Sequence, residues 1–276
     1  MMRRVARILT KCLSLIVICC ASCSALNFHS NLASIKVDAS PGESVNSQFN
    51  LTLAADQPPT QFHLHTQDFY RSEDGRQSFY KPGGTLTHSC ANWVTINPVD
   101  TTVQSGAQLN ARLTINVPGD VKPGGYWCVL TVDEVPNPLR VTPKGIGMEM
   151  FASISVGVFV SVLPIQKSIK IEEVQIQDNR LTVRVADTGD CPFSAEGRVE
   201  FLKADDKTPL ATAAFPKTAL FCEPINTAMM SAPLPDEKTL PSGHYQVRVI
   251  LDIGLDHYIG VRKDMDINRV PAAPRI

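Results

Sequence analysis

The sequence predicts an all-β protein built from two immunoglobulin-like β-sandwich domains in tandem, behind an N-terminal signal peptide. Three observations predict this fold. Short runs of alternating or continuous apolar residues recur along the chain, Pro, Gly, Asn and Asp separate them about every ten positions, and no long stretch shows a helical period. The 276 residues suit a signal followed by two domains of roughly 100 to 140 residues each.

Residues 1–25 have the pattern of a secretory signal peptide. Basic residues precede an apolar stretch, residues 12–21, which is short for a bilayer span. Cys23 and Ala25 are small enough for the two positions that a signal peptidase recognises, so we expect cleavage after Ala25. The alternative is a lipoprotein anchored through Cys23, although Cys20 stands where a lipobox needs an aliphatic residue. Either way we expect export, to the periplasm or the cell exterior.

Four cysteines remain once the signal is removed. An exported chain meets an oxidising environment, so these residues are expected to form disulfide bonds. Four cysteines allow three pairings, and the pairing within domains joins Cys90 to Cys128 and Cys191 to Cys222. No Cys-x-x-Cys or His-x-x-x-His spacing follows the signal, which disfavours a metal site.

The first domain is expected to span residues 27–165 with about seven strands. The expected strands are residues 34–38, 44–54, 60–69, 93–97, 108–117, 126–132 and 146–163. Glycines that follow Pro or Asp supply the turn geometry that bulky residues resist. These turns include Pro41-Gly42, Asp74-Gly75, Pro82-Gly83-Gly84 and Pro123-Gly124-Gly125.

A short polar joint leads into the second domain, residues 166–267. Its expected strands are residues 169–177, 180–187, 195–202, 210–215, 227–232 and 245–252. The last segment, residues 268–276, contains two prolines and few apolar side chains, so we expect a loose C-terminal tail.

Charge and motifs argue against several classes of function. With 26 basic and 27 acidic side chains, the chain has no excess charge to attract nucleic acid or an anionic membrane. No Gly-x-Ser-x-Gly elbow occurs, and cysteines in disulfides cannot act as thiolates. We therefore expect no enzymatic activity, no cofactor and no small-molecule substrate.

Two groups of residues resemble sets of metal ligands but lack a complete pattern. His63 and His65 are one residue apart on an expected strand and project to one side, but nothing marks a third ligand. The acidic residues near the C terminus lack the spacing of a calcium-binding loop; they are Asp252, Asp256, Asp264 and Asp266. No metal site is predicted.

A phrase shared by the two halves points to a group of proteins. Residues 121–136 read VKPGGYWCVLTVDEVP and residues 240–251 read LPSGHYQVRVIL, each a proline and glycine turn before a strand that opens with Tyr. This phrase resembles the penultimate strand of bacterial immunoglobulin-like modules of envelope proteins. Residues 183–189 also resemble a strand and turn of that group, with Asp187 where Asn is usual.

A narrower resemblance is to the periplasmic pilus-assembly chaperones. These proteins pair two such domains, and after a strand ending in Glu-hydrophobic-Pro they carry a loop and a long alternating edge strand. Here Glu134, Val135 and Pro136 end the strand, and a loop of residues 137–147 follows. The apolar positions of the alternating strand are Ile154, Val156, Val158, Val160 and Val162. The resemblance implies that this strand lends backbone and apolar side chains to an incomplete subunit by β-augmentation.

The resemblance also implies two basic side chains that clamp the terminal carboxylate of the subunit. Lys36 is the candidate on the first strand, whereas residues 153–163 contain no Lys or Arg. We expect a non-enzymatic, protein-binding protein of the cell envelope that contacts another envelope or surface protein through residues 148–163. The alternative is a structural or adhesive surface module in which this strand is simply core.

Overall fold

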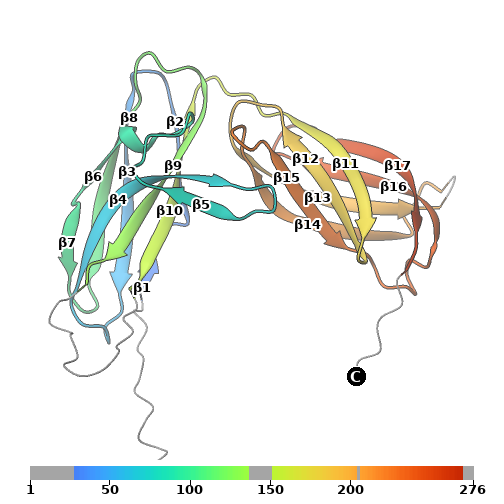
Figure 1. The fold of residues 1–276 in the computed structure, drawn as a ribbon, viewed down its shortest axis with the longest axis horizontal. Helices are drawn as coiled ribbons and strands as arrows, with labels where there is room; N and C mark the ends of the chain where they lie inside the picture. The colour runs from blue at the N-terminus through green and yellow to red at the C-terminus, as the bar shows by residue number, and fades with distance from the viewer. Residues whose placement is uncertain (1–27, 137–150, 204–205, 270–276) are drawn as a thin grey trace, which may run out of the picture.

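The computed structural model describes residues 28–136, 151–203 and 206–269. The expected signal peptide, the loop of residues 137–147 and the start of the strand expected at 146–163 lie outside this part of the chain. The described residues form four β-sheets and one short 3-10 helix, η1 (Ala91–Trp93), so the all-β prediction is confirmed (Figure 1). Within these ranges no helix has both the length and the apolar character needed to cross a membrane.

Two sheets enclose the first core. In spatial order, one contains β1 (Phe28–Ser30), β3 (Ser44–Leu53), β8 (Gln108–Asn116) and β6 (Val94–Asn97). The other contains β2 (Ser34–Ala39), β10 (Ser153–Val162), β9 (Gly124–Glu134), β4 (Thr60–Arg71) and β5 (Gln77–Tyr80), while β7 (Asp100–Val103) also pairs with β4. Alternate residues of the longer strands point inward, and Phe49, Leu113 and Leu130 are fully buried between the layers.

Two further sheets enclose a separate second core. One contains β11 (Ile169–Gln177), β12 (Arg180–Asp187) and β15 (Thr227–Pro233). The other contains β14 (Ala211–Leu220), β13 (Phe193–Leu202), β16 (Gly243–Asp252) and β17 (Ile259–Ile267). Asp178 and Asn179 have positive φ angles of 51° and 58°, which fit the two-residue turn between β11 and β12. Because the cores are separate, we propose the domain division at residues 165 and 166.

Several expected strands differ from the observed ones. Strands β1, β5, β7 and β17 were not predicted, because three of them are very short and β17 carries charges on both faces. The strand expected to end at residue 215 continues to Leu220. A register shift in its partner between Ala195 and Gly197 accommodates Pro216, which cannot donate a ladder hydrogen bond.

The beginning of the expected tail is fixed to the second domain. Arg269 donates hydrogen bonds from its guanidinium group to the carbonyl oxygens of Pro235 and of Leu240, the latter at 2.7 Å. Residues 270–276 lie outside the described part of the chain.

Candidate functional site

Strand β10 is paired along its whole length on one side and along only part of it on the other. It runs antiparallel to β9 from Ser153 opposite Asp133 to Val162 opposite Gly124. Its parallel partner β2 begins at Ser34, opposite Gly157. No described strand is paired with the outer edge of residues 153–156. This open edge lies where the chain crosses from β1, in one sheet, to β2, in the other.

The backbone hydrogen bonds show which groups point out of the open edge. Glu134 donates its N–H to the carbonyl of Ala152 at 2.9 Å, so the even-numbered residues of β10 bond to β9. The odd-numbered residues face the opposite side, as the bond from the Leu163 N–H to the Ala39 carbonyl at 3.0 Å confirms. The N–H and C=O groups of Ser153 and Ser155 therefore point outward, with no partner in the described residues.

Two acidic residues at the end of β9 fix the start of β10. The Ser153 hydroxyl donates to Asp133 Oδ1 at 2.6 Å, and the Ala152 N–H donates to Glu134 Oε2 at 3.1 Å. Glu134 is the acidic residue of the Glu-hydrophobic-Pro sequence. Its carboxylate thus helps to hold the open edge in an extended conformation.

The apolar residues of β10 face the first core. Val156, Val158, Val160 and Val162 are at most 1% exposed, and Ile154 is partly buried against the same core. Their alternation is therefore accounted for by packing between the two sheets. What this strand can offer a partner is its backbone at the open edge, together with the exposed side chains of Ser153 and Ser155. A partner-binding role for the strand remains a proposal.

Of the two basic positions implied by the chaperone resemblance, only the first has a candidate residue, Lys36. Lys36 on β2 is exposed, and its partner in the parallel register is Phe159 of β10. The ring of Phe159 lies over Gly157, where an added Cβ would be only 2.7 Å from a ring carbon. An aromatic ring thus occupies the position on β10 that faces Lys36.

A cluster of aromatic side chains connects the outer face of this sheet to the second domain. Its buried members include Phe69, Trp127 and Phe221, with Phe159 packed against them. Phe221 of the second domain meets Phe69 edge to face at 5.8 Å between ring centres, and the Trp127 indole N–H donates to the Phe69 carbonyl at 3.0 Å. Sequence analysis missed this cluster. The available signal was Phe159, a large aromatic at an outward position of a strand.

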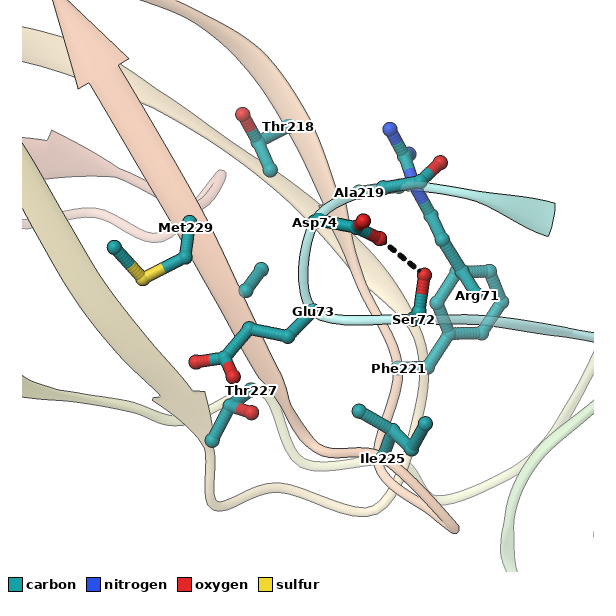
Figure 2. A pocket seen from close by; sticks show the side chains of 12 residues that line it. Arg71, Ser72, Glu73, Asp74, Thr218, Ala219, Phe221, Ile225, Thr227 and Met229 are labelled. Carbon is teal, nitrogen blue, oxygen red and sulfur yellow. Dashed lines mark hydrogen bonds between the residues drawn. The ribbon is translucent and has the colours of Figure 1, made fainter.

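The hairpin of β4 and β5 makes a polar contact with the second domain. The Glu73 carbonyl accepts the Met229 N–H at 3.1 Å, and the Glu73 carboxylate pairs with Arg184, which also binds Glu172 at 2.9 Å. Glu73 and Met229 both line a small cavity of about 80 Å³ between the hairpin and the second domain. Figure 2 shows the side chains that line it. The hairpin and the aromatic cluster together join the two domains.

Replacing Glu73 with Gln should loosen this contact without unfolding either domain. The ion pair with Arg184 is partly exposed, so its loss should cost no more than about 1 kcal/mol. We expect faster hydrogen exchange at the Met229 amide, because the hairpin then opens more often. Asp74→Asn is the control, since Asp74 binds Ser72 and Arg76 within the hairpin. Equal protection of Met229 in the two variants would contradict the contact's role.

The cysteines expected to pair are close to one another but are thiols in this structure. The sulfur atoms of Cys90 and Cys128 lie 3.3 Å apart in the first core. Cys191 and Cys222 extend the register of β13 and β14, in which Phe193 lies opposite Leu220. Burial raises the pKa of Cys191 to about 11 and that of Cys222 to about 12. The two disulfide bonds therefore remain predictions.

His63 and His65 stack with 5.4 Å between ring centres. His63 Nδ1 lies 2.7 Å from Asp100 Oδ1, while burial and the nearby Lys81 lower the pKa of His65. The described residues contain no group of three or more His, Cys, Asp or Glu side chains that could hold a metal ion.

No protein-family profile and no curated protein matches the sequence. Solved structures do match it. The fold resembles that of fimbrial periplasmic chaperones. The class 5 fimbriae chaperone CfaA is 12% identical, with a TM-score of 0.52 over 86% of this chain and 99% of that one. A chain from a chaperone–tip adhesin complex of CFA/I fimbriae biogenesis is also 12% identical, with a TM-score of 0.50 over 86% of this chain and 98% of that one.

At this identity the comparison establishes the fold alone. It confirms the predicted immunoglobulin-like sandwiches and the distant resemblance to pilus-assembly chaperones. Because the match covers 86% of the chain, the likeness includes both sandwiches rather than one.

Proposed function

We propose that the protein is an exported, non-enzymatic chaperone-like factor that holds another envelope or surface protein by β-augmentation at the open edge of β10. One observation carries the proposal. Residues 153–156 pair with β9 on one side, and on the other side the backbone groups of Ser153 and Ser155 have no partner in the described residues. The resemblance in fold to fimbrial chaperones supports this reading, and the N-terminal signal pattern supports a periplasmic location.

The open edge is short, which suits a reversible contact. Two residues present four backbone groups, and each hydrogen bond contributes about 0.5 to 1.5 kcal/mol net, or about 2 to 6 kcal/mol together. Ile154 is partly buried at the rim of the first core and offers apolar contact beside these groups. The edge is held straight by Asp133 and Glu134, so little ordering is needed on binding.

A structural or adhesive surface module is the second candidate. The observation that favours it is the burial of Val156, Val158, Val160 and Val162, which explains the alternating pattern without any partner. In that case the open edge would bind nothing transiently. The two candidates differ in whether the edge of β10 is needed to capture another protein.

Replacing Ser155 with Pro tests the difference. Proline removes the outward N–H and places its ring across the edge, so capture of a partner from the native envelope should be lost. The fold should persist, because the Ser155 side chain is exposed and its N–H faces away from β9. Ser155→Thr is the matched control, since threonine keeps the N–H and suits a strand. The measurement is affinity capture with each purified variant, followed by identification of the bound proteins.

The outcome separates the candidates. Capture of the same protein by wild type and Ser155→Thr, but not by Ser155→Pro, supports β-augmentation. Equal capture by all three proteins contradicts it. If none of them captures a protein, the chaperone-like role fails and the structural module is favoured.

A further inference from the structure

Three arginines surround a shallow depression on the outer face of the second domain. Arg198, Arg248 and Arg262 come from the adjacent strands β13, β16 and β17, and the depression has a volume of about 360 Å³. Arg248 and Arg262 are direct cross-strand partners, so their side chains leave neighbouring strands side by side. This surface shares no residue with the edge of β10.

The positive charge of this depression is only partly neutralised. Glu200 binds Arg198 Nε at 2.8 Å and Arg248 Nη1 at 3.1 Å, and its side chain is only 8% exposed. Arg262 takes part in no ion pair within the described ranges. The Nε atom of Arg248 is buried and has no acceptor there. Other acidic residues of this sheet make no ion pair with the three arginines; they are Glu196, Asp252, Asp264 and Asp266.

One carboxylate among three guanidinium groups leaves an excess of two positive charges. Like charges directly opposite each other on a sheet are destabilising. An anion that reached Arg262 and Arg248 together would remove this repulsion, and the planar guanidinium fork suits the oxygen atoms of a phosphate or carboxylate. The charge pattern therefore favours an oxyanion as the ligand.

The shape of the depression also favours a ligand that carries a ring next to the oxyanion. Gly260 lies opposite Ile250, and an added Cβ there would be 2.8 Å from the Val249 carbonyl oxygen, so the absence of a side chain keeps the floor low. Tyr258 immediately precedes β17, lines the same depression and is 66% exposed. It takes part in no ring contact within the described residues. A flat aromatic surface thus stands beside an apolar floor and a cationic rim.

We propose that this depression binds a phosphate or carboxylate group attached to a ring. The acidic group lies between Arg248 and Arg262, and the ring lies against Tyr258 and Ile250. Three probes test the assignment by calorimetric titration of the mature protein at low salt: phenyl phosphate, benzoate and inorganic phosphate. We expect phenyl phosphate or benzoate to bind with a Kd of about 1 mM or tighter, and inorganic phosphate to bind more weakly. The tighter of the two ring compounds identifies the acidic group.

Two substitutions separate the contributions of charge and ring. Arg262→Ala should weaken the binding of every probe about tenfold. Arg112→Ala, which removes an exposed arginine from the first domain, should leave binding unchanged. Tyr258→Ala should abolish the preference for the ring compounds while inorganic phosphate still binds. Added phenyl phosphate should also raise the unfolding temperature of the wild type but not of Arg262→Ala.

The proposal is overturned if none of the three probes binds the wild type. It is also overturned if Arg262→Ala and Arg112→Ala bind the probes equally, because the arginines would then be an ordinary solvated face. Neither result bears on capture at the β10 edge, so this proposal and the chaperone-like function fail independently.

Discussion

Replacing Asp68 with Ala should lower the free energy of unfolding by at least about 3 kcal/mol. Asp68 is 1% exposed, and its carboxylate accepts hydrogen bonds from one loop of the first domain. The donors are the N–H groups of Gly84, Thr85 and Leu86, at 2.8, 2.6 and 2.9 Å, and the hydroxyls of Thr85 and Ser89. Alanine leaves these partly buried donors without that acceptor, and a donor left unsatisfied costs up to about 1 to 3 kcal/mol.

The same loop positions Cys90 beside Cys128, so Asp68→Ala should also impair formation of that predicted disulfide bond. Urea unfolding at neutral pH measures the loss of stability. Asp120→Ala is the control, since Asp120 is exposed and should change stability by no more than about 0.5 kcal/mol. A loss below about 1 kcal/mol for Asp68→Ala would show that the loop is held by other contacts.

The pKa of Asp68 adds a check on the same network. Burial raises this pKa, but the hydrogen bonds from Ser89, Gly84, Leu86 and Thr85 outweigh it, so the net pKa lies below the ordinary value of 3.8. A carboxyl with a lowered folded pKa stabilises the protein above its unfolded pKa, and this contribution disappears as the pH falls through the folded pKa. The difference in the free energy of unfolding between wild type and Asp68→Ala should therefore become smaller below about pH 4.

Replacing Asp187 with Asn should have the opposite effect and stabilise the protein above pH 6. Burial raises the pKa of Asp187 from 3.8 to about 6, the Gly189 N–H partly offsets this, and the nearby Asp190 adds to it. One carboxylate oxygen accepts the Gly189 N–H at 2.8 Å, whereas the other is buried and has no hydrogen-bond partner among the described residues. Ionised Asp187 is thus a buried charge with incomplete compensation.

The direction of the pH dependence of stability follows from the raised pKa of Asp187. The protonated form is favoured by folding, so its contribution is complete below pH 3.8 and is lost as the pH rises through about 6. A shift of this size corresponds to up to about 3 kcal/mol. Asn stays neutral and can still accept the Gly189 N–H. The free energy of unfolding of Asp187→Asn should therefore exceed that of wild type by about 1 to 3 kcal/mol at pH 8 and equal it at pH 3.

Unfolding measured between pH 3 and pH 8 tests this prediction, with each protein at acidic pH as its own control. The difference in stability between Asp187→Asn and wild type should grow across the interval from about pH 4 to pH 6. A difference that does not change with pH would mean that the pKa of Asp187 is not raised.

Local signals predicted much of the fold. Strands β11 and β12 were predicted with the bounds that the structure shows, because their apolar residues alternate and Asp178-Asn179 supplies a turn with positive φ angles. The alternation of the valines of β10 was recognised in the same way, but the sequence left open whether they face a partner or the core, and the structure places them in the core. Strand β5 was missed, since a four-residue strand of mostly exposed side chains gives no periodic signal.

The candidate site depended on contacts that no local pattern encodes. Whether the edge of β10 is open depends on where β2 begins, and β2 begins opposite Gly157 because the chain changes sheets just before Ser34. In the sequence, Phe159 interrupts the alternating pattern of the strand. In the structure it packs against the cluster that contains Phe221, a residue 62 positions further along the chain. The partners of Asp68 are likewise set by tertiary structure, 16 to 21 positions away.

The central claim is that residues 153–156 of β10 have an open edge. Residue-resolved hydrogen exchange of the free, mature protein tests it directly, because neighbouring amides of this strand face opposite sides. We predict fast exchange at Ser153 and Ser155, and slow exchange at Ile154 and Val156, whose N–H groups face β9. Equal protection of all four amides would show that another part of the chain covers this edge, and would contradict the account.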